Sequence, residues 1–126
     1  MNKTNDIHGR IYSYVIRVLK VTKELSRTPE DLVIIDQITR SVTSMGANDK
    51  EADGAISIKD FIHKYSIVRK EAKETDYWLH IIADTHPHLK LRMMQLLQES
   101  NEIIKIVSAI IYNTKNNKRI DNIVNY

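Results

Sequence analysis

A seam of regularly spaced apolar residues constrains the fold of this 126-residue chain more than any other feature. Between residues 58 and 82, apolar or small side chains recur at strictly alternating steps of three and four, as they do in a coiled coil. The seam consists of Ile58, Phe61, Tyr65, Val68, Ala72, Thr75, Leu79 and Ile82. This spacing puts every member on one face of a long helix, which must bury that face against other helices.

Capping residues mark where the other helices begin and end. Thr28 is expected to cap a helix that starts at Pro29, and Ser57 to cap the next helix in a capping box with Asp60. Gly54 is expected to follow the end of the earlier of these two helices in a left-handed conformation. The predicted helices cover residues 8–26, 29–52, 57–85 and 87–112.

Short connections between long helices predict an all-α domain over residues 1–114, an antiparallel up-down-up-down four-helix bundle. Residues 115–126 are polar and lack helical periodicity, so we predict a flexible C-terminal tail. Asp49 occupies a position of the second helix where an apolar residue is expected. Either that helix reaches past the core there, or its last turn is tilted towards solvent.

The last predicted helix carries two apolar rows. One is its seam, and the other consists of Leu97, Ile104 and Ile111, which repeat every seven residues. A helix that is apolar over this much of its circumference has neighbours on two sides. One side faces the core, and the other is a candidate oligomer interface. Trp78 lies beside the seam of residues 58–82 and joins this candidate interface, because Trp is enriched at interfaces.

No motif in the chain points to an enzyme. Cysteine is absent and the three glycines are isolated, which excludes thiolate sites and a glycine-rich phosphate loop. Di-iron helical bundles need Glu-x-x-His motifs on two helices, but Asp60-x-x-His63 has no counterpart. We therefore predict a protein that is not an enzyme, with no catalytic residue, cofactor, metal or small-molecule substrate.

The sequence also bears on location. It contains no run of about 18 apolar residues, so no membrane span is expected. No apolar stretch follows a basic start, so no secretory signal is expected either. These features predict a cytoplasmic protein.

Charge is distributed unevenly along the chain, although the net charge is only +3. Residues 7–27 contain five basic residues and one acidic residue, whereas residues 28–56 contain two basic and six acidic residues. Such asymmetry serves either a nucleic-acid surface or the electrostatic fit of one helix or subunit to the next. For a nucleic-acid surface, the candidate phosphate contacts are Arg10, Arg17, Lys20 and Lys23.

Two stretches of the chain are similar to a known family. Residues 37–48 contain the pattern Q-x-x-R-S-x-x-S-x-x-A-N, and residues 57–79 contain S-x-x-D-F followed by K-E-A-x-E-T-x-Y-W-L. Together they resemble bacterial four-helix bundle proteins related to those encoded in 23S rRNA intervening sequences, some of which are labelled ribosomal proteins. The resemblance covers about residues 8–113 and leaves out the tail.

This resemblance implies a left-handed bundle that assembles into a homo-oligomeric ring, with five subunits in known relatives. It also implies a link to RNA or to an RNA-associated protein, with a pure protein-interaction scaffold as the alternative. Relatives often have an apolar residue at the position of Asp49. The motif residues that match imply a structural polar network between helices, made of Gln37, Arg40, Ser44, Asn48 and Glu74.

Overall fold

Four helices make up the computed structural model, which describes the backbone of residues 6–124 and the side chains of residues 6–117. They are α1 (Ile7–Thr22), α2 (Pro29–Ala52), α3 (Ile58–Thr85) and α4 (Lys90–Val124), with a 3-10 turn, η2 (Pro87–Leu89), before α4. The described residues contain no strand. The prediction of an all-α four-helix bundle is therefore confirmed.

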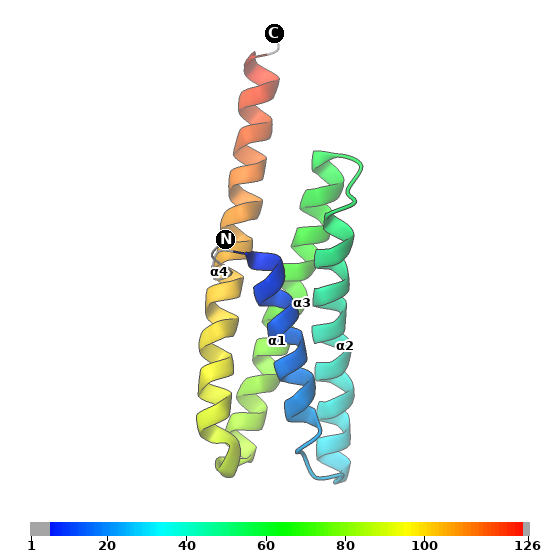
Figure 1. The fold of residues 1–126 in the computed structure, drawn as a ribbon, viewed down its shortest axis with the longest axis vertical. Helices are drawn as coiled ribbons and strands as arrows, with labels where there is room; N and C mark the ends of the chain where they lie inside the picture. Colours follow the sequence, from blue (N-terminus) through cyan, green and yellow to red (C-terminus); the bar gives the residue numbers. More distant parts are fainter. Residues whose placement is uncertain (1–5, 125–126) are drawn as a thin grey trace.

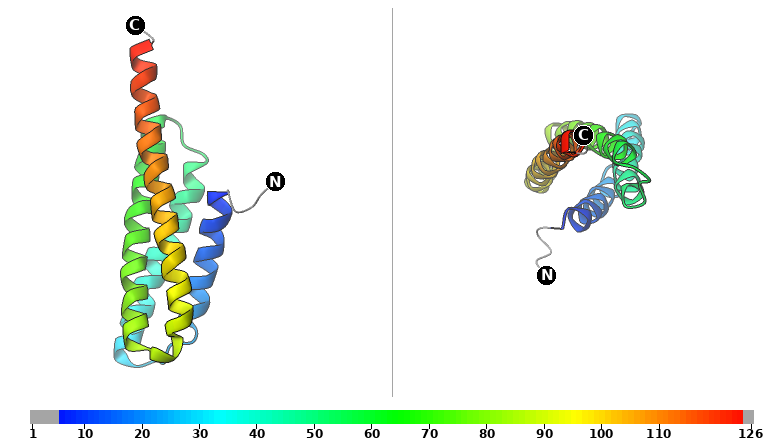
Figure 2. Two further views of the ribbon diagram at one scale, coloured as in Figure 1. Left: turned by 90° about the vertical axis from the view of Figure 1, so that its left-hand side faces the viewer. Right: turned by 90° about the horizontal axis from the view of Figure 1, so that it is seen from above.

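The four helices lie side by side, and their connections lie alternately at the lower and upper ends of the bundle in Figure 1. α1 and α3 each pack against both α2 and α4, whereas the diagonal pairs do not come close within the described residues. α1 is the shortest helix, so it leaves the upper part of α3 and α4 uncovered, and α4 projects beyond the other helices (Figures 1 and 2). The handedness of the bundle stays a prediction.

Two of the predicted helix caps are present. The Thr28 hydroxyl accepts a hydrogen bond from the Asp31 backbone N–H at 3.2 Å, and the Ser57 hydroxyl accepts one from the Asp60 N–H at 3.0 Å. The Asp60 carboxylate accepts a hydrogen bond from the Ile56 backbone N–H, at 3.3 Å, and not from the Ser57 N–H as it would in a regular capping box. Both caps satisfy N–H groups that the first helical turn leaves without partners.

The first helix is shorter than predicted: α1 ends at Thr22, whereas the predicted end was residue 26. The next three backbone N–H groups, from Lys23 to Leu25, donate to carbonyls three residues earlier. Bonds of this 3-10 type tighten the chain as it leaves the helix. The tight turn still returns Leu25 to the core, where it is 4% exposed.

The second helix has the predicted bounds, since α2 runs from Pro29 to Ala52, but the predicted conformation of Gly54 and the predicted end of the last helix are wrong. Gly54 does not adopt the left-handed conformation, and α2 instead ends in a turn with bonds from residues 53 and 54 to carbonyls three residues earlier. α4 continues to Val124, so the predicted end at residue 112 and the non-helical tail are wrong for residues 113–124. The chain has no proline or glycine after Pro87, so no residue there breaks the helix. Residues 125 and 126 lie outside the described part.

The α3 seam forms the centre of the core, as predicted. Six consecutive members are at most 1% exposed: Tyr65, Val68, Ala72, Thr75, Leu79 and Ile82. Ile58 is 43% exposed, since it lies above the level at which α1 begins. On α4, Ile111 of the second apolar row is buried like Val107, because a straight helix drifts relative to a strict seven-residue repeat.

Asp49 is part of the core, so both interpretations of this position were wrong. Its Oδ1 accepts a hydrogen bond from the Tyr65 hydroxyl at 2.7 Å and lies 2.9 Å from Nδ1 of His8 on α1. The residue is 5% exposed, and a carboxylate is tolerated at such a depth only when it has partners. Burial and the charge of Asp49 raise the pKa of Tyr65, so its hydroxyl remains a donor.

A similar pair lies at the opposite end of α2. Asp31 is 5% exposed, and its Oδ1 lies 3.1 Å from Nε2 of His86, which follows α3. Each end of α2 therefore carries a buried carboxylate that contacts a histidine of another helix or connection. None of the described helices combines the length and the apolar character needed to cross a membrane.

Candidate nucleic-acid interface

A small basic groove lies between α1 and α4 near the lower end of the bundle. Arg17 and Lys20 reach it from α1, and Arg92 and Gln95 reach it from α4. Its volume is about 150 Å³, and its remaining lining residues are Val21 and Leu96. Three cationic side chains and one amide thus converge on a space that lies between two helices.

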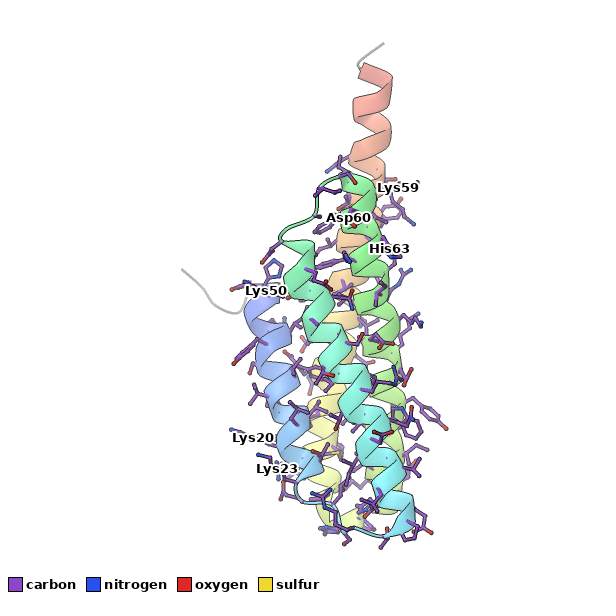
Figure 3. The ribbon with its side chains drawn as sticks, turned by 90° about the vertical axis from the view of Figure 1, so that its right-hand side faces the viewer. Lys20, Lys23, Lys50, Lys59, Asp60 and His63 are labelled. Carbon is purple, nitrogen blue, oxygen red and sulfur yellow. The ribbon has the colours of Figure 1, made fainter. Side chains whose placement is uncertain are left out.

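Two of these three cations have no acidic partner among the described residues. Arg92 forms an ion pair with Glu24, through one nitrogen of its guanidinium. Arg17 and Lys20 form no ion pair with any described residue. Lys23 is exposed just after α1, and Figure 3 shows Lys20 and Lys23 along the same outer edge of that helix. Lys20 and Lys23 also lie at the C-terminal end of α1, where the helix dipole is negative, so their positive charges stabilise the helix as well.

Arg10 is placed differently from the other three candidate contacts. Its Nε and Nη2 donate to the two carboxylate oxygens of Glu99 on α4, at 3.1 and 2.6 Å, and Nη2 also lies 3.4 Å from Glu102. The hydrogen bonds to Glu99 raise the pKa of the guanidinium above its usual value. Arg10 therefore joins α1 to α4 and is not free for a phosphate.

Sequence reasoning missed Arg92 and Gln95 as members of the groove. The chain after residue 87 is visibly basic, but nothing local says which of its residues lie next to α1. The pairing of α1 with α4 decides this, because it brings Arg92 to the level of Arg17 and Lys20.

The four residues of the candidate oligomer interface are buried or partly buried within their own chain. Ile111 is 2% exposed and belongs to the core of its own chain. Trp78, Leu97 and Ile104 are partly buried and pack against that core. Among the side chains of α4 that the structure describes, the exposed large apolar ones are Leu91, Met94 and Tyr112.

Asp60 and His63, the one carboxylate–histidine motif noted above, lie on the upper part of α3 (Figure 3). Among the described residues, no three or more His, Cys, Asp or Glu side chains gather in a way that could hold a metal ion.

Residues 3–109 match the family model described as 23S rRNA-intervening sequence protein. The chain belongs to this family. It is also similar to a crystal structure of a protein of unknown function from the S23 ribosomal protein family of Bacteroides thetaiotaomicron, with 35% identity and a TM-score of 0.76. That match covers 83% of this chain and 97% of the other. No curated protein matches the chain.

The five motif residues of this 23S rRNA-intervening sequence protein family, which were expected to form one polar network, do not all contact one another. Arg40 on α2 forms ion pairs with Glu71, at 3.3 Å, and with Glu74, both on α3. The indole N–H of Trp78 donates to Glu74 at 3.4 Å, which extends this cluster along α3. The hydrogen bond with Glu74 raises the pKa of Arg40. This cluster ties α2 to α3, and it reaches from the exposed Arg40 to the buried Glu71.

The other motif residues do not join that cluster. The amide of Asn48 donates to the Ser44 carbonyl at 2.9 Å and to the Ser44 hydroxyl at 3.4 Å, both within α2. Gln37 is partly buried, and no hydrogen bond links it to the other motif residues in the described structure. A contact that the motif did not suggest joins α2 and α3 in the core, between the Ser41 and Thr75 hydroxyls at 2.8 Å.

Proposed function

We propose that this protein is a non-enzymatic helical bundle that binds RNA through the basic groove between α1 and α4. The observation that carries the proposal is the convergence of Arg17, Lys20 and Arg92 on one groove, two of them without an acidic partner among the described residues. Cations held side by side on rigid helices neutralise neighbouring phosphates and release the counterions bound to them. Lys23 extends the positive edge, and Arg10 is excluded because Glu99 and Glu102 hold it.

The family description supports RNA over another polyanion. The matching family is described as 23S rRNA-intervening sequence protein, and the similar solved structure is described as S23 ribosomal protein family. Both descriptions connect the family with ribosomal RNA or the ribosome, without naming an activity. Arg and Gln side chains both contact phosphates in nucleic-acid complexes, and both types line the groove.

The test is an RNA titration by fluorescence anisotropy at several salt concentrations, with a labelled hairpin from 23S rRNA as the probe. Binding through several phosphates weakens steeply with salt, with a slope of roughly 0.7–0.9 for each phosphate neutralised. The variant Arg17→Glu/Lys20→Glu should lower both the affinity and this slope. Its matched control is Lys59→Glu/Lys70→Glu, because both lysines are exposed on α3 and the change in net charge is the same.

The outcomes separate the proposal from non-specific attraction. A loss confined to the α1 variant supports the groove, whereas an equal loss in the α3 control shows attraction to the whole surface and refutes it. The absence of binding at low salt refutes an RNA role for the chain altogether.

A homo-oligomeric assembly scaffold is the second candidate, and a ring of five subunits is its expected form. It is favoured by the exposed apolar residues of α4, with Leu91 at 73% and Met94 at 56%, next to the partly buried Leu97. These residues follow one another at steps of three along α4, and a contiguous apolar patch at a protein surface is typical of an interaction site.

Size-exclusion chromatography with light scattering tests the scaffold. The wild-type protein should run as one discrete oligomer, and Leu97→Glu should convert it to a smaller species that retains its helical circular-dichroism spectrum. Gln98→Glu is the matched control, because it adds the same charge at the adjacent exposed position. A monomeric wild-type protein, or an oligomer that Leu97→Glu leaves unchanged, would count against this interface.

A further inference from the structure

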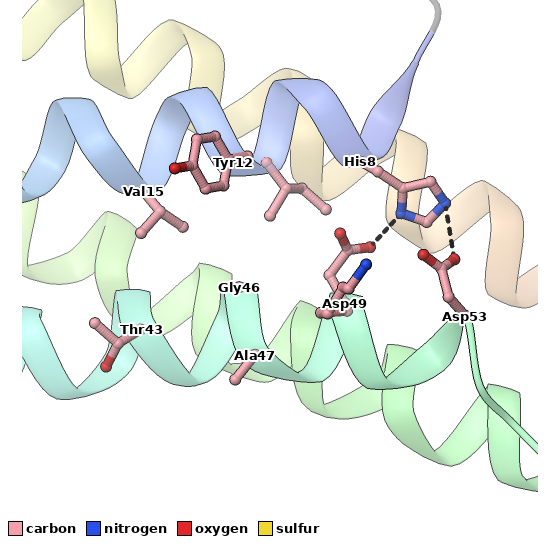
Figure 4. Close-up of a pocket in the computed structure, with 10 residues that line it drawn as sticks. His8, Tyr12, Val15, Thr43, Gly46, Ala47, Asp49 and Asp53 are labelled. Carbon is pink, nitrogen blue, oxygen red and sulfur yellow. Dashed lines mark hydrogen bonds and ion pairs between the residues drawn. The ribbon is translucent and has the colours of Figure 1, made fainter.

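A second and larger groove lies between α1 and α2. Its volume is about 560 Å³, which is within the range of pockets that hold small organic molecules. Figure 4 shows how side chains of α1 face those of α2 across this space. The lining residues include Ile11, Tyr12 and Val15 of α1 and Thr43, Gly46 and Ala47 of α2.

The groove exists because α2 presents small side chains to α1 along this stretch. Gly46 lies close to α1, since a Cβ atom added there would meet Cγ2 of Val15 at 3.1 Å. Thr43 and Ala47, which are also small, line the groove beside it. Most of the resulting wall is apolar, so it suits the apolar part of a ligand.

One end of the groove is acidic. Asp49 and Asp53 line it, together with His8, whose Nε2 lies 3.5 Å from the Asp53 carboxylate. Lys50 also lines the groove but is exposed, so its long side chain can keep its charge in water. Ligands that carry a negative charge are disfavoured at this end, since two carboxylates face it.

The Asp49 carboxylate has one oxygen that forms no hydrogen bond with the part of the chain that the structure describes. Its side chain is 7% exposed, and both of its hydrogen-bond partners, Tyr65 and His8, contact Oδ1. No described residue bonds to Oδ2, and Figure 4 shows this oxygen turned into the space between the helices. Oδ2 still reaches solvent, because the one buried side-chain oxygen or nitrogen without a partner among the described residues is Oδ1 of Asp76. A cationic donor can therefore reach Oδ2 from the groove, and its attraction to a carboxylate that is largely buried is stronger than at the open surface, where the dielectric constant is higher.

We propose that the α1–α2 groove binds a small amphipathic amine. The ammonium group donates to Asp49 Oδ2 and lies near Asp53, while the apolar body lies along Ile11, Val15 and Ala47. This site is on the opposite side of α1 from the basic groove, so it is a second site and not part of the proposed RNA surface.

The test uses 2-(1-naphthyl)ethylamine as the probe, measured by calorimetry and by amide chemical shifts. Its neutral counterpart, 2-(1-naphthyl)ethanol, and the anion 1-naphthylacetate have the same ring and isolate the effect of charge. The amine should bind saturably and shift the amide signals of residues 11–15 and 43–50. Equal binding of all three compounds, or no saturable binding of the amine up to about 10 mM, would overturn the proposal.

Two variants test the two halves of the site. Asp49→Asn should weaken amine binding about tenfold or more, because a charge-assisted hydrogen bond is lost, whereas Asp36→Asn, an exposed position on α2, should not. Ala47→Phe should block the groove from its exposed rim without changing the core, and it decides the outcome if Asp49→Asn does not fold. Arg17→Glu/Lys20→Glu should leave amine binding unchanged. Wild-type affinity in Ala47→Phe would refute the site.

Discussion

Removing the hydroxyl of Tyr65 should destabilise the bundle far more than the loss of one atom suggests. In Tyr65→Phe, the Asp49 carboxylate loses the donor at 2.7 Å and keeps only His8, which is itself exposed. Hydrogen bonds to charged groups contribute about 1.5–3 kcal/mol. The phenylalanine ring fills the same space, so no cavity adds to this cost. We therefore expect the free energy of unfolding to fall by about 2 kcal/mol.

A double-mutant cycle that also replaces Asp49 tests the hydrogen bond between Asp49 and Tyr65. Asp49→Leu leaves the Tyr65 hydroxyl buried without a partner, which costs about 1–3 kcal/mol before the gain from the apolar side chain. In Asp49→Leu/Tyr65→Phe, neither polar group remains in the core. The double variant should therefore be more stable than the sum of the single effects predicts, by about 1–2 kcal/mol.

Urea denaturation followed by circular dichroism measures these differences. With a slope of about 1–3 kcal/mol per molar urea, a loss of about 2 kcal/mol moves the midpoint by roughly 1 M. All variants must be compared at one protein concentration, because self-association would add to the apparent stability. Tyr77→Phe is the matched control, since Tyr77 is 56% exposed, and its effect should stay within about 0.5 kcal/mol.

Two results would refute this reasoning. One is an effect of Tyr65→Phe no larger than that of Tyr77→Phe, which would mean that Asp49 does not depend on the hydroxyl. The other is a double variant whose cost equals the sum of the single costs, which would mean that the two side chains are not coupled in the native state.

Three more predictions follow from individual side chains. Oδ1 of Asp76 is buried without a hydrogen-bond partner among the described residues, and burial raises the pKa of this carboxyl group. The folded chain therefore binds the proton more tightly than the unfolded chain, and stability falls as pH rises above about 4. Asp76→Asn should therefore be more stable than the wild type at neutral pH, and the difference in urea midpoint should vanish near pH 3. Burial also raises the pKa of Tyr14 and Tyr65, so stability should fall as pH rises above about 10, where phenols of the unfolded chain ionise; an ultraviolet titration should show two tyrosines that ionise only on unfolding. Arg10→Gln should lower the free energy of unfolding by about 1 kcal/mol, because it breaks the partly buried ion pair with Glu99, but it should leave RNA affinity unchanged. Arg17→Gln should instead weaken RNA binding with little effect on stability.

The boundaries of the helices show where local signals suffice. Thr28 and Ser57 were recognised as caps because a side-chain oxygen next to the first helical N–H groups acts within a few residues. The predicted ends of α1 and α4 were wrong, because no comparable side-chain signal marks where these two helices end. α1 stops early in a turn that returns Leu25 to the core, and α4 continues through a polar stretch that contains no helix breaker.

The candidate sites depend more heavily on packing between helices. The excess of basic residues on α1 was visible in the sequence, yet Arg10 is held by Glu99 while Arg17 and Lys20 share a groove with Arg92. The positions of these basic residues along α1 do not by themselves show which of them has an acidic partner. Their different partners come from which turn of α4 each one meets.

The sequence by itself determined that the chain forms helices, how many there are and which face of α3 is buried, because apolar periodicity and caps act through the geometry of a single helix. It also determined the family, through motifs that lie within α2 and α3. Only the tertiary structure decided that Asp49 belongs to the core, because its partners, His8 and Tyr65, come from two other helices. A buried carboxylate is stable only where such partners meet it, and the meeting of helix faces is a property of the whole bundle.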